Sequence, residues 1–162
     1  MVWSSYWKTI LLFIVTVNSW NGIVAQKAYV IVDKPNLRLY VIENMDTVFN
    51  VPVCVGKNRG NKVKVGDNRT PEGEFTVCEI QDSRQWKHDF NDGKGMRKGA
   101  YGPWFIRLNT RRWKGIGIHG TCFPNSVGTR DSEGCIRLRN EDLCQLKEWV
   151  SINTKVTILP DR

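Results

Sequence analysis

The segments GIGIHGT (residues 115–121) and SEGCIRL (residues 132–138) carry the pattern that decides the fold of this sequence. Side chains alternate along a β-strand, so the two isoleucines of the first segment would face one side while Gly117 and His119 face the other. Gly117 predicts open space beside the imidazole, and Gly117 with Gly120 would let a ligand backbone approach closely. The first segment therefore predicts one wall of a groove.

The second segment carries a candidate nucleophile, Cys135. The thiolate is the form that attacks a carbonyl, and an unperturbed thiol with a pKa of about 8.5 is only slightly ionised at neutral pH. His119 is the candidate base, because the other histidine, His88, lies in a polar stretch. The pair is expected to ionise as thiolate and imidazolium, and the imidazolium would then protonate a leaving amine.

Neighbours of Cys135 add to this interpretation. Gly134 can adopt backbone angles closed to other residues, so the amides of Gly134 and Cys135 would point together at a developing oxyanion. Arg137 lies on the same side of a strand as Cys135 and offers a planar fork for a substrate carboxylate. Ser132 is expected to hydrogen-bond the loop or the imidazole. A lone histidine or cysteine in a β protein is more typical of a structural role, but the combination indicates a site.

Working outward, the sequence is mainly β: short segments rich in β-branched and aromatic residues alternate with clusters of Asn, Gly, Asp and Pro. The expected strands cover residues 28–32, 37–42, 48–55, 75–80, 104–108, 115–120 and 156–160. One helix is expected before the last strand, with Asn140 as its N-cap. Its apolar residues recur at helical spacing, namely Leu143, Leu146 and Val150. Residues 81–100 are polar and contain three glycines, which predicts a flap-like excursion over a site.

Four segments, in this order along the chain, resemble the signature of the L,D-transpeptidase catalytic domain family, also called the YkuD-type family. They are TPEGEF (residues 70–75), YGPWF (101–105), HGT (119–121) and SEGCIRL (132–138). The resemblance covers about residues 27–160 and implies a β-sandwich or barrel of short strands with one C-terminal helix. A single catalytic domain is therefore expected over residues 26–162.

The resemblance also implies roles for individual residues. Cys135 would be the nucleophile and His119 the base, with the backbone carbonyl of Gly120 orienting the imidazole as the third member of a triad. The backbone amides of Glu133, Gly134 and Cys135 would form the oxyanion hole.

Substrate-binding roles are assigned to Arg137, which matches the motif arginine of the family. Three further residues are expected to contribute to the substrate cleft, namely Ser132, Tyr101 and Trp104. Many members have His between the motif Ser and Gly, where this sequence has Glu133. Because this position would act through its main chain, the chemistry is expected to survive, but an acid that points inward would oppose thiolate formation.

Ping-pong acyl transfer without a cofactor or metal is the mechanism that the resemblance implies. Cys135 would attack the carbonyl that joins the third residue of a peptidoglycan stem tetrapeptide to a terminal D-amino acid, and would keep the acyl part as a thioester. An amine of a neighbouring stem would resolve the thioester as a 3–3 cross-link, whereas water would make the same site an L,D-carboxypeptidase. Both outcomes stay open.

The first 25 residues predict a signal peptide that is cleaved after Ala25. They contain one cation, Lys8, and no acid, and their apolar run at residues 10–17 is shorter than the roughly 20 residues of a membrane span. We therefore expect export to the periplasm or cell wall without a permanent membrane anchor. A buried N-terminal strand or helix is the alternative.

The formal net charge of +8 originates in the middle of the chain. Residues 55–114 contain 14 Lys and Arg against seven Asp and Glu, whereas the rest of the chain after residue 25 has nine of each. This surplus indicates either a solvated face or attraction to an anionic cell-wall polymer, and export argues against a nucleic-acid partner. The protein is expected to be a monomer.

The five cysteines are an odd number, so at least one thiol stays unpaired. If Cys135 is that thiol, the candidate disulfides join Cys54 to Cys78 and Cys122 to Cys144, with free buried thiols as the alternative.

Two other classes of site stay open. A structural zinc site would draw its ligands from His119, Cys122, Cys135 and Cys144, although the last two lack the usual tight spacing. A noncatalytic wall-binding module would use the basic middle of the chain and carry a vestigial cysteine motif.

Overall fold

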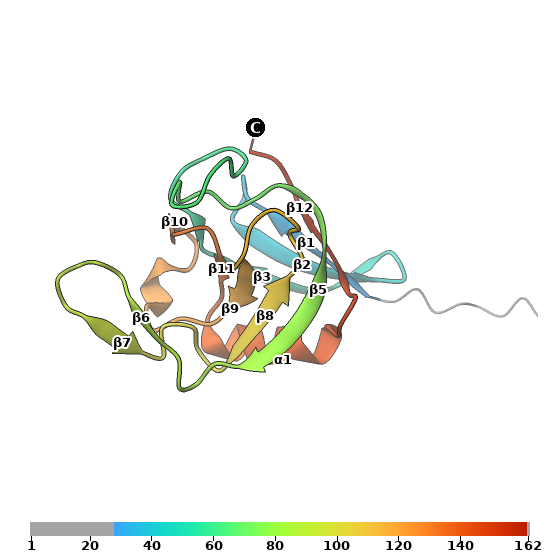
Figure 1. The fold of residues 1–162 in the computed structure, drawn as a ribbon. Helices are drawn as coiled ribbons and strands as arrows, with labels where there is room; N and C mark the ends of the chain where they lie inside the picture. The colour runs from blue at the N-terminus through green and yellow to red at the C-terminus, as the bar shows by residue number, and fades with distance from the viewer. Residues whose placement is uncertain (1–27, 162) are drawn as a thin grey trace, which may run out of the picture.

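The computed structural model describes residues 28–161, so the expected signal peptide at residues 1–25 lies outside the described part. Most strands belong to one curled sheet of eight, and the one α-helix of these described residues lies along its lower edge in Figure 1. The strands are β1 (Tyr29–Asp33), β2 (Arg38–Glu43), β3 (Asp46–Pro52), β4 (Val55–Gly56), β5 (Gly73–Asp82), β6 (Lys87–Asp89), β7 (Met96–Lys98), β8 (Trp104–Leu108), β9 (Gly117–His119), β10 (Arg130–Ser132), β11 (Ile136–Arg137) and β12 (Lys155–Ile158). The helices are the 3-10 turn η1 (Pro124–Ser126) and α1 (Asn140–Trp149).

The order of strands in the large sheet is β11-β9-β8-β5-β12-β1-β2-β3. Two small sheets join β4 to β10 and β6 to β7. The mainly β fold with one helix before the last strand confirms the expected fold class. Within the described residues, no helix combines the length and apolar composition needed to cross a bilayer.

Alternating hydrophobic residues explain the first half of the sheet. Val30 and Val32 of β1 are fully buried, as are Leu39 and Val41 of β2, while the residues between them are partly exposed. β1 and β2 pair antiparallel, with these three valines and one leucine facing the same core. Each such side chain contributes about 1.5–3 kcal/mol by leaving water, so this face fixes the register of the hairpin.

The other half of the sheet brings the two motif segments together. β9 pairs antiparallel with β8 and parallel with β11, so that Ile118 lies opposite Ile136 and His119 lies opposite Arg137. Both isoleucines are fully buried in the core. The sheet therefore places Cys135, which precedes β11, beside the strand that carries His119.

The helix α1 forms where the apolar spacing predicted it, with Leu143, Leu146 and Val150 buried. The prediction that Asn140 caps the helix is wrong, because Arg139 occupies the N-cap position without a side-chain capping bond. The Asn140 Oδ1 instead accepts a hydrogen bond of 2.9 Å from the Thr121 amide. Its side chain thus ties the helix to the segment after His119.

The flap, residues 83–100, is a loop that contains the β6–β7 hairpin and projects to the left in Figure 1. Residues 81 and 82, which the sequence analysis assigned to the excursion, continue β5. The expected strand at residues 48–55 is interrupted after Pro52, because the chain leaves β3 and pairs again as β4 with β10. The short strand β10 was not predicted, and a strand at β11 was assumed only in placing Arg137 on the same side as Cys135.

Neither candidate disulfide forms, since all five cysteines are free. Cys54 is fully buried, and its backbone exchanges two hydrogen bonds of 2.8 Å with Arg137. Cys78 is exposed on β5, with its thiol directed at the Arg107 carbonyl at 3.5 Å. A core thiol and a surface thiol cannot meet, which explains the failure of the first pairing.

A buried ion network holds the loop that becomes one wall of the site. This wall loop, residues 57–72, is fastened by Lys34, whose Nζ donates to the carbonyls of Gly60 at 3.1 Å and Thr70 at 3.3 Å. The same ammonium lies 2.6 Å from Glu72 and 3.1 Å from Asp161. Lys34 is 1% exposed, so these oxygens replace its water shell.

Candidate active site

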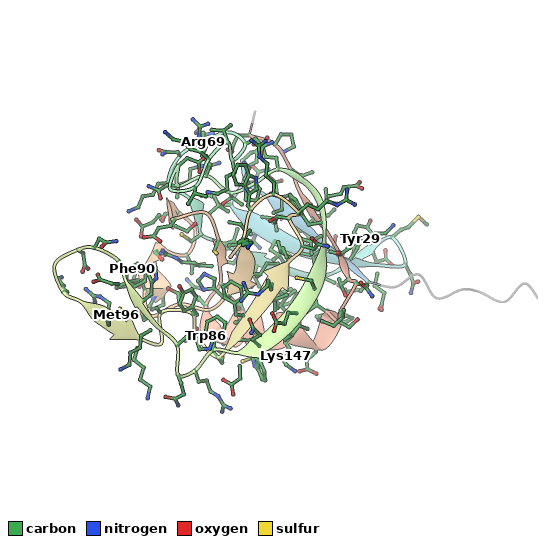
Figure 2. All side chains as sticks on the ribbon, in the orientation of Figure 1. Tyr29, Arg69, Trp86, Phe90, Met96 and Lys147 are labelled. Carbon is green, nitrogen blue, oxygen red and sulfur yellow. The ribbon has the colours of Figure 1, made fainter. Side chains whose placement is uncertain are left out.

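A cleft of about 450 Å³ lies between the wall loop, the flap and the strands β9 and β11. Arg69 and Phe90, labelled in Figure 2, mark the wall loop and the flap on its two sides. The cleft is lined by Lys62, Val65, Gly66, Asn68, His88, Phe90, Asn91, Ala100, Tyr101, Trp113, Lys114, Gly115, Ile116, His119, Ser132, Glu133, Cys135 and Arg137. The cleft therefore brings Cys135, His119 and Arg137 together from segments that are separate in the sequence.

The His119 imidazole is held rigidly at the base of the cleft. Its Nδ1 lies 2.6 Å from the Gly120 carbonyl, so that nitrogen carries the proton and Nε2 is the basic atom. The Phe105 ring stacks on the imidazole with centroids 5.4 Å apart and planes 13° apart, and the Tyr101 ring lies at 5.0 Å. Tautomer and orientation are both fixed by the surrounding protein.

Burial lowers the pKa of His119 to about 3, because a charged imidazole would lose its water. The hydrogen bond to Gly120 opposes this shift, whereas the positive charge of Arg137 adds to it. His119 is 3% exposed and therefore neutral at ordinary pH.

Gly117 and Gly120 allow neighbouring parts of the protein to pack closely against the backbone on either side of His119. A side chain at Gly117 would strike the Phe105 ring at 2.5 Å, so the expected open space beside the imidazole is filled by that ring. A side chain at Gly120 would meet the Asn140 amide and the backbone of Gly102. The expectation that these glycines admit a ligand backbone is therefore wrong.

The Cys135 thiol is half-buried and donates to the Gly115 carbonyl at 3.3 Å. Burial raises its pKa, and the nearby Gly117 backbone and the Arg137 charge oppose that shift only in part. With the pKa of Cys135 raised and that of His119 lowered, the resting pair is a neutral thiol and a neutral imidazole. The prediction that the resting pair is a thiolate and an imidazolium is therefore wrong, because the low-dielectric surroundings disfavour both charged forms.

The loop before Cys135 is braced by Ser132. Its hydroxyl donates to the Cys135 carbonyl at 2.6 Å and accepts from the Gly134 amide at 3.1 Å. Gly134 has a φ of +135°, and a Cβ there would lie 2.9 Å from the Arg69 carbonyl, so glycine is required on two grounds. Ser132 lines the cleft but its hydroxyl serves the loop, and the Gly134 amide is engaged rather than aimed at an oxyanion.

The side chain of Glu133 points to the flap. Its carboxylate lies 3.1 Å from the Nε2 of His88, and the Nδ1 of His88 lies 3.1 Å from the Tyr101 hydroxyl. His88 was set aside in the sequence analysis because it lies in a polar stretch. Two signals in the sequence point to His88. It is one of only two histidines, and it lies between aromatic residues of an excursion predicted to cover a site.

Arg137 is 5% exposed and already has partners in the cleft. Its guanidinium lies 3.6 Å from Asp131 and 5.5 Å from the centroid of the Phe90 ring. Trp104, predicted to line the cleft, lies outside it, with the Lys147 ammonium 4.7 Å from its ring. The tryptophan that does line the cleft is Trp113, beside which Lys62 lies at 5.8 Å.

The zinc alternative has no support in the part of the chain that the structure describes, since no three His, Cys, Asp or Glu side chains are grouped there as metal ligands.

The fold and the cleft define a mainly β domain with a cysteine and a histidine in one site. The family model of the L,D-transpeptidase catalytic domain (YkuD) matches residues 27–158. The chain therefore belongs to the L,D-transpeptidase catalytic domain family, which confirms the resemblance seen in the sequence.

Relatives from two Bacillus species carry the name of an L,D-transpeptidase. YkuD of Bacillus licheniformis is 33% identical over 124 residues, which are 76% of this chain and 59% of the relative. YqjB of Bacillus subtilis is 32% identical over 135 residues, which are 82% of this chain and 72% of the relative. The chain thus spans between about three fifths and three quarters of these relatives.

Solved structures share the fold. The catalytic domain of the Enterococcus faecium L,D-transpeptidase matches with a TM-score of 0.61 and 20% identity, covering 82% of this chain and 97% of that one. Bd1075 of Bdellovibrio bacteriovorus matches with a TM-score of 0.58 and 24% identity, covering 83% of this chain and 48% of that one.

Proposed function

We propose that this protein is a cysteine acyltransferase that acts on peptidoglycan stem peptides, with Cys135 as nucleophile and His119 as base. The observation that carries the proposal is the cleft itself, which is lined by both Cys135 and a neutral His119 imidazole whose Nδ1 is fixed on the Gly120 carbonyl. Because Nδ1 carries the proton in this tautomer, Nε2 is free to act as the base that removes the proton of the thiol.

The reaction starts from the neutral pair. As the sulfur of Cys135 attacks the acyl carbon, its proton passes to Nε2 of His119, and the carbonyl oxygen becomes an oxyanion. When the intermediate collapses, the C–N bond breaks, and the imidazolium returns the proton to the departing amine of the D-amino acid. The product of this half-reaction is a thioester on Cys135 with His119 neutral again.

A second amine completes the transfer. It attacks the thioester, gives its proton to His119, and forms the new amide as the C–S bond breaks and Cys135 recovers its proton. An amine from a neighbouring stem gives a 3–3 cross-link, and water in its place gives an L,D-carboxypeptidase.

Backbone amides supply the charge stabilisation in this proposal. The amide of Gly134 is occupied by Ser132, so the oxyanion role falls to the amides of Glu133 and Cys135. Arg137 and Tyr101 line the same cleft and are the candidate contacts for the stem peptide. The guanidinium of Arg137 would exchange Asp131 for a substrate carboxylate.

The test is mass spectrometry of muropeptides incubated with the protein, together with measurement of released D-amino acid. Wild type is expected to release the terminal D-amino acid and to form a new cross-link or a shortened stem. Cys135→Ala is expected to do neither, while Cys78→Ala, which removes an exposed thiol outside the cleft, keeps the activity. Equal product from wild type and Cys135→Ala would reject the proposal.

The same proposal includes export to the periplasm or cell wall. It also includes action as a monomer, without a membrane anchor or nucleic acid, and attraction to an anionic wall polymer. Exposed cations beside the cleft support the last point, because Lys57, Lys64, Arg111, Arg112 and Lys114 project from two neighbouring loops. Co-sedimentation of Cys135→Ala with purified cell walls should fall as salt rises. Binding without turnover by wild type would instead favour a noncatalytic wall-binding module.

A further inference from the structure

His88 of β6 joins the flap to the cleft. The ring bridges the Glu133 carboxylate at 3.1 Å and the Tyr101 hydroxyl at 3.1 Å. Glu133 lies two residues before Cys135, and the Tyr101 ring lies 5.0 Å from the His119 ring. One flap residue therefore contacts the immediate neighbours of both candidate catalytic residues.

The chemistry of these three groups sets the direction of the two hydrogen bonds. An ionised carboxylate only accepts, so Nε2 of His88 must donate to Glu133. Nδ1 of a neutral imidazole then accepts, and the Tyr101 hydroxyl donates to it. Burial raises the pKa of Tyr101, with the acidic groups of Cys135 and Glu133 adding to the shift, so the hydroxyl keeps the proton that it donates.

Phe90 strengthens the same contact from the next turn of the flap. Its ring lies edge-on to His88 at 4.6 Å and to Phe123 at 5.1 Å, and the Arg137 guanidinium lies 5.5 Å from its centroid. The Phe90 ring covers one side of the His88 imidazole, although 29% of the His88 side chain and 48% of the Glu133 side chain stay exposed to solvent. His88 and Phe90 thus form one unit against the cleft.

Few other contacts hold the outer part of the flap, among them that of the Arg97 guanidinium, which lies 5.1 Å from the centroid of the Phe123 ring. No side chain of residues 84–99 belongs to the buried apolar core, and residues 91–94 are all exposed. Trp86 anchors the base, with its ring 5.5 Å from Phe105, but the hairpin beyond it has three residue pairs. A segment with so few buried contacts opens at low free-energy cost, so loss of a single contact shifts its population.

We propose that His88 is a positioning residue that latches the flap over Cys135 by bridging Glu133 to Tyr101. With the latch closed, Glu133 is held away from the thiol and the flap covers the cleft. With the latch open, large molecules reach Cys135 while the catalytic pair itself is unchanged. The consequence for turnover rests on the proposed function, but the closure of the flap does not.

The experiment measures how fast thiol reagents of two sizes modify Cys135, located by peptide mapping. The ratio of the rate for a polymer-linked maleimide to that for iodoacetamide cancels the intrinsic reactivity of the thiol and reports access. His88→Ala is expected to raise this ratio about five-fold, because the loss of one ordinary hydrogen bond shifts the equilibrium between closed and open flap by about that factor. The exposed Cys144 serves as an internal reference in the same sample.

Matched variants separate the latch from general loosening. Lys87→Ala, at an exposed neighbouring position of the same strand, should leave the ratio unchanged. Tyr101→Phe and Glu133→Gln should each raise it, and His88→Gln, which retains one donor and one acceptor, should restore part of the closure. The double variant His88→Ala with Glu133→Gln should open no further than His88→Ala alone, because Glu133→Gln weakens by loss of charge the same bond that His88→Ala removes.

Hydrogen exchange gives an independent readout on the flap. Amides of residues 87–98 should exchange about five-fold faster in His88→Ala, with the core strands β1 and β2 unaffected. If His88→Ala melts early, Tyr101→Phe and Glu133→Gln carry the test. An unchanged reagent ratio and unchanged exchange in these variants would overturn the latch, as would strict additivity in the double variant.

The muropeptide assay distinguishes this idea from the proposed function. An active enzyme should show a rise in KM with kcat changed only a few-fold in His88→Ala, and recovery of KM in His88→Gln. Absence of any turnover in wild type, with the reagent ratios behaving as expected, would reject the proposed function and leave the latch standing.

Discussion

Lys34→Met tests the idea that a buried ion network holds the wall of the cleft. Methionine keeps the length of the side chain and removes the charge, so the carboxylates of Glu72 and Asp161 lose a partner at 2.6 Å and 3.1 Å. The carbonyls of Gly60 and Thr70 lose a donor as well. We expect both a loss of stability and a displaced wall loop.

The size of the effect follows from what is left behind. Removing one partner of a buried ion pair costs about 3–5 kcal/mol. Asp161 keeps Arg130 and the Gly60 amide, which donates at 2.7 Å, so the lower figure of about 3 kcal/mol applies. A domain of about 130 residues has an unfolding entropy of about 0.27 kcal/mol/K, which makes the expected fall in Tm about 11 °C.

The pH dependence has a definite sign. Burial alone would raise the pKa of Asp161, but the Gly60 amide, Lys34 and Arg130 outweigh it and hold the pKa below its usual range. A carboxyl with a lowered pKa stabilises the fold above its unfolded pKa of about 3.9 and loses that contribution as pH falls. The difference between wild type and Lys34→Met should therefore shrink below about pH 4.

The assay is urea unfolding followed by circular dichroism at pH 7 and pH 3.5, with Lys155→Met as the control. Lys155 is exposed on β12, and its replacement should change the free energy of unfolding by less than about 0.5 kcal/mol. A loss below 1 kcal/mol in Lys34→Met at pH 7, or a loss that is the same at both pH values, would refute the reasoning.

Three further predictions concern the cleft. Gly134→Ala should cost about 1–3 kcal/mol and most of the activity, because φ is +135° and the Arg69 carbonyl lies 2.9 Å from the new Cβ; an unchanged melting curve would contradict this. The ring of His119, with a pKa of about 3, should stay neutral by NMR down to about pH 4. The free energy of unfolding should fall as pH drops below about 6.5, because His119 then binds a proton in the unfolded chain but not in the folded one. Alkylation of Cys135 should accelerate with pH beyond the ordinary pKa of a thiol, because burial raises its pKa, and a plateau below pH 8 would argue against that shift.

Local pattern explains which parts of the fold were predicted. The alternation around Val30 and Leu39 and the helical spacing of Leu143 and Leu146 were enough to place two strands and the helix, because both periods are properties of a short segment. The N-cap failed because Asn140 bonds Thr121, and that contact exists only after the helix docks on the sheet.

The strands β10 and β11 are absent from the strands predicted by periodicity for a related reason. They contain three and two residues, and each is defined by a partner far along the chain, Val55–Gly56 for one and Gly117–His119 for the other. A segment this short has no period of its own, so pairing alone makes it a strand.

The sequence by itself determined that Cys135 and His119 belong to one site, since their motifs lie in the order typical of one family. Only the tertiary structure decided their protonation, because a pKa depends on how far a group is removed from water. Only the tertiary structure brought His88 to Glu133 across 45 residues, because such a contact arises when the flap folds back over the cleft. Spacing in the chain encodes which face a residue takes, whereas its partners and its charge are set by what the folded chain places around it.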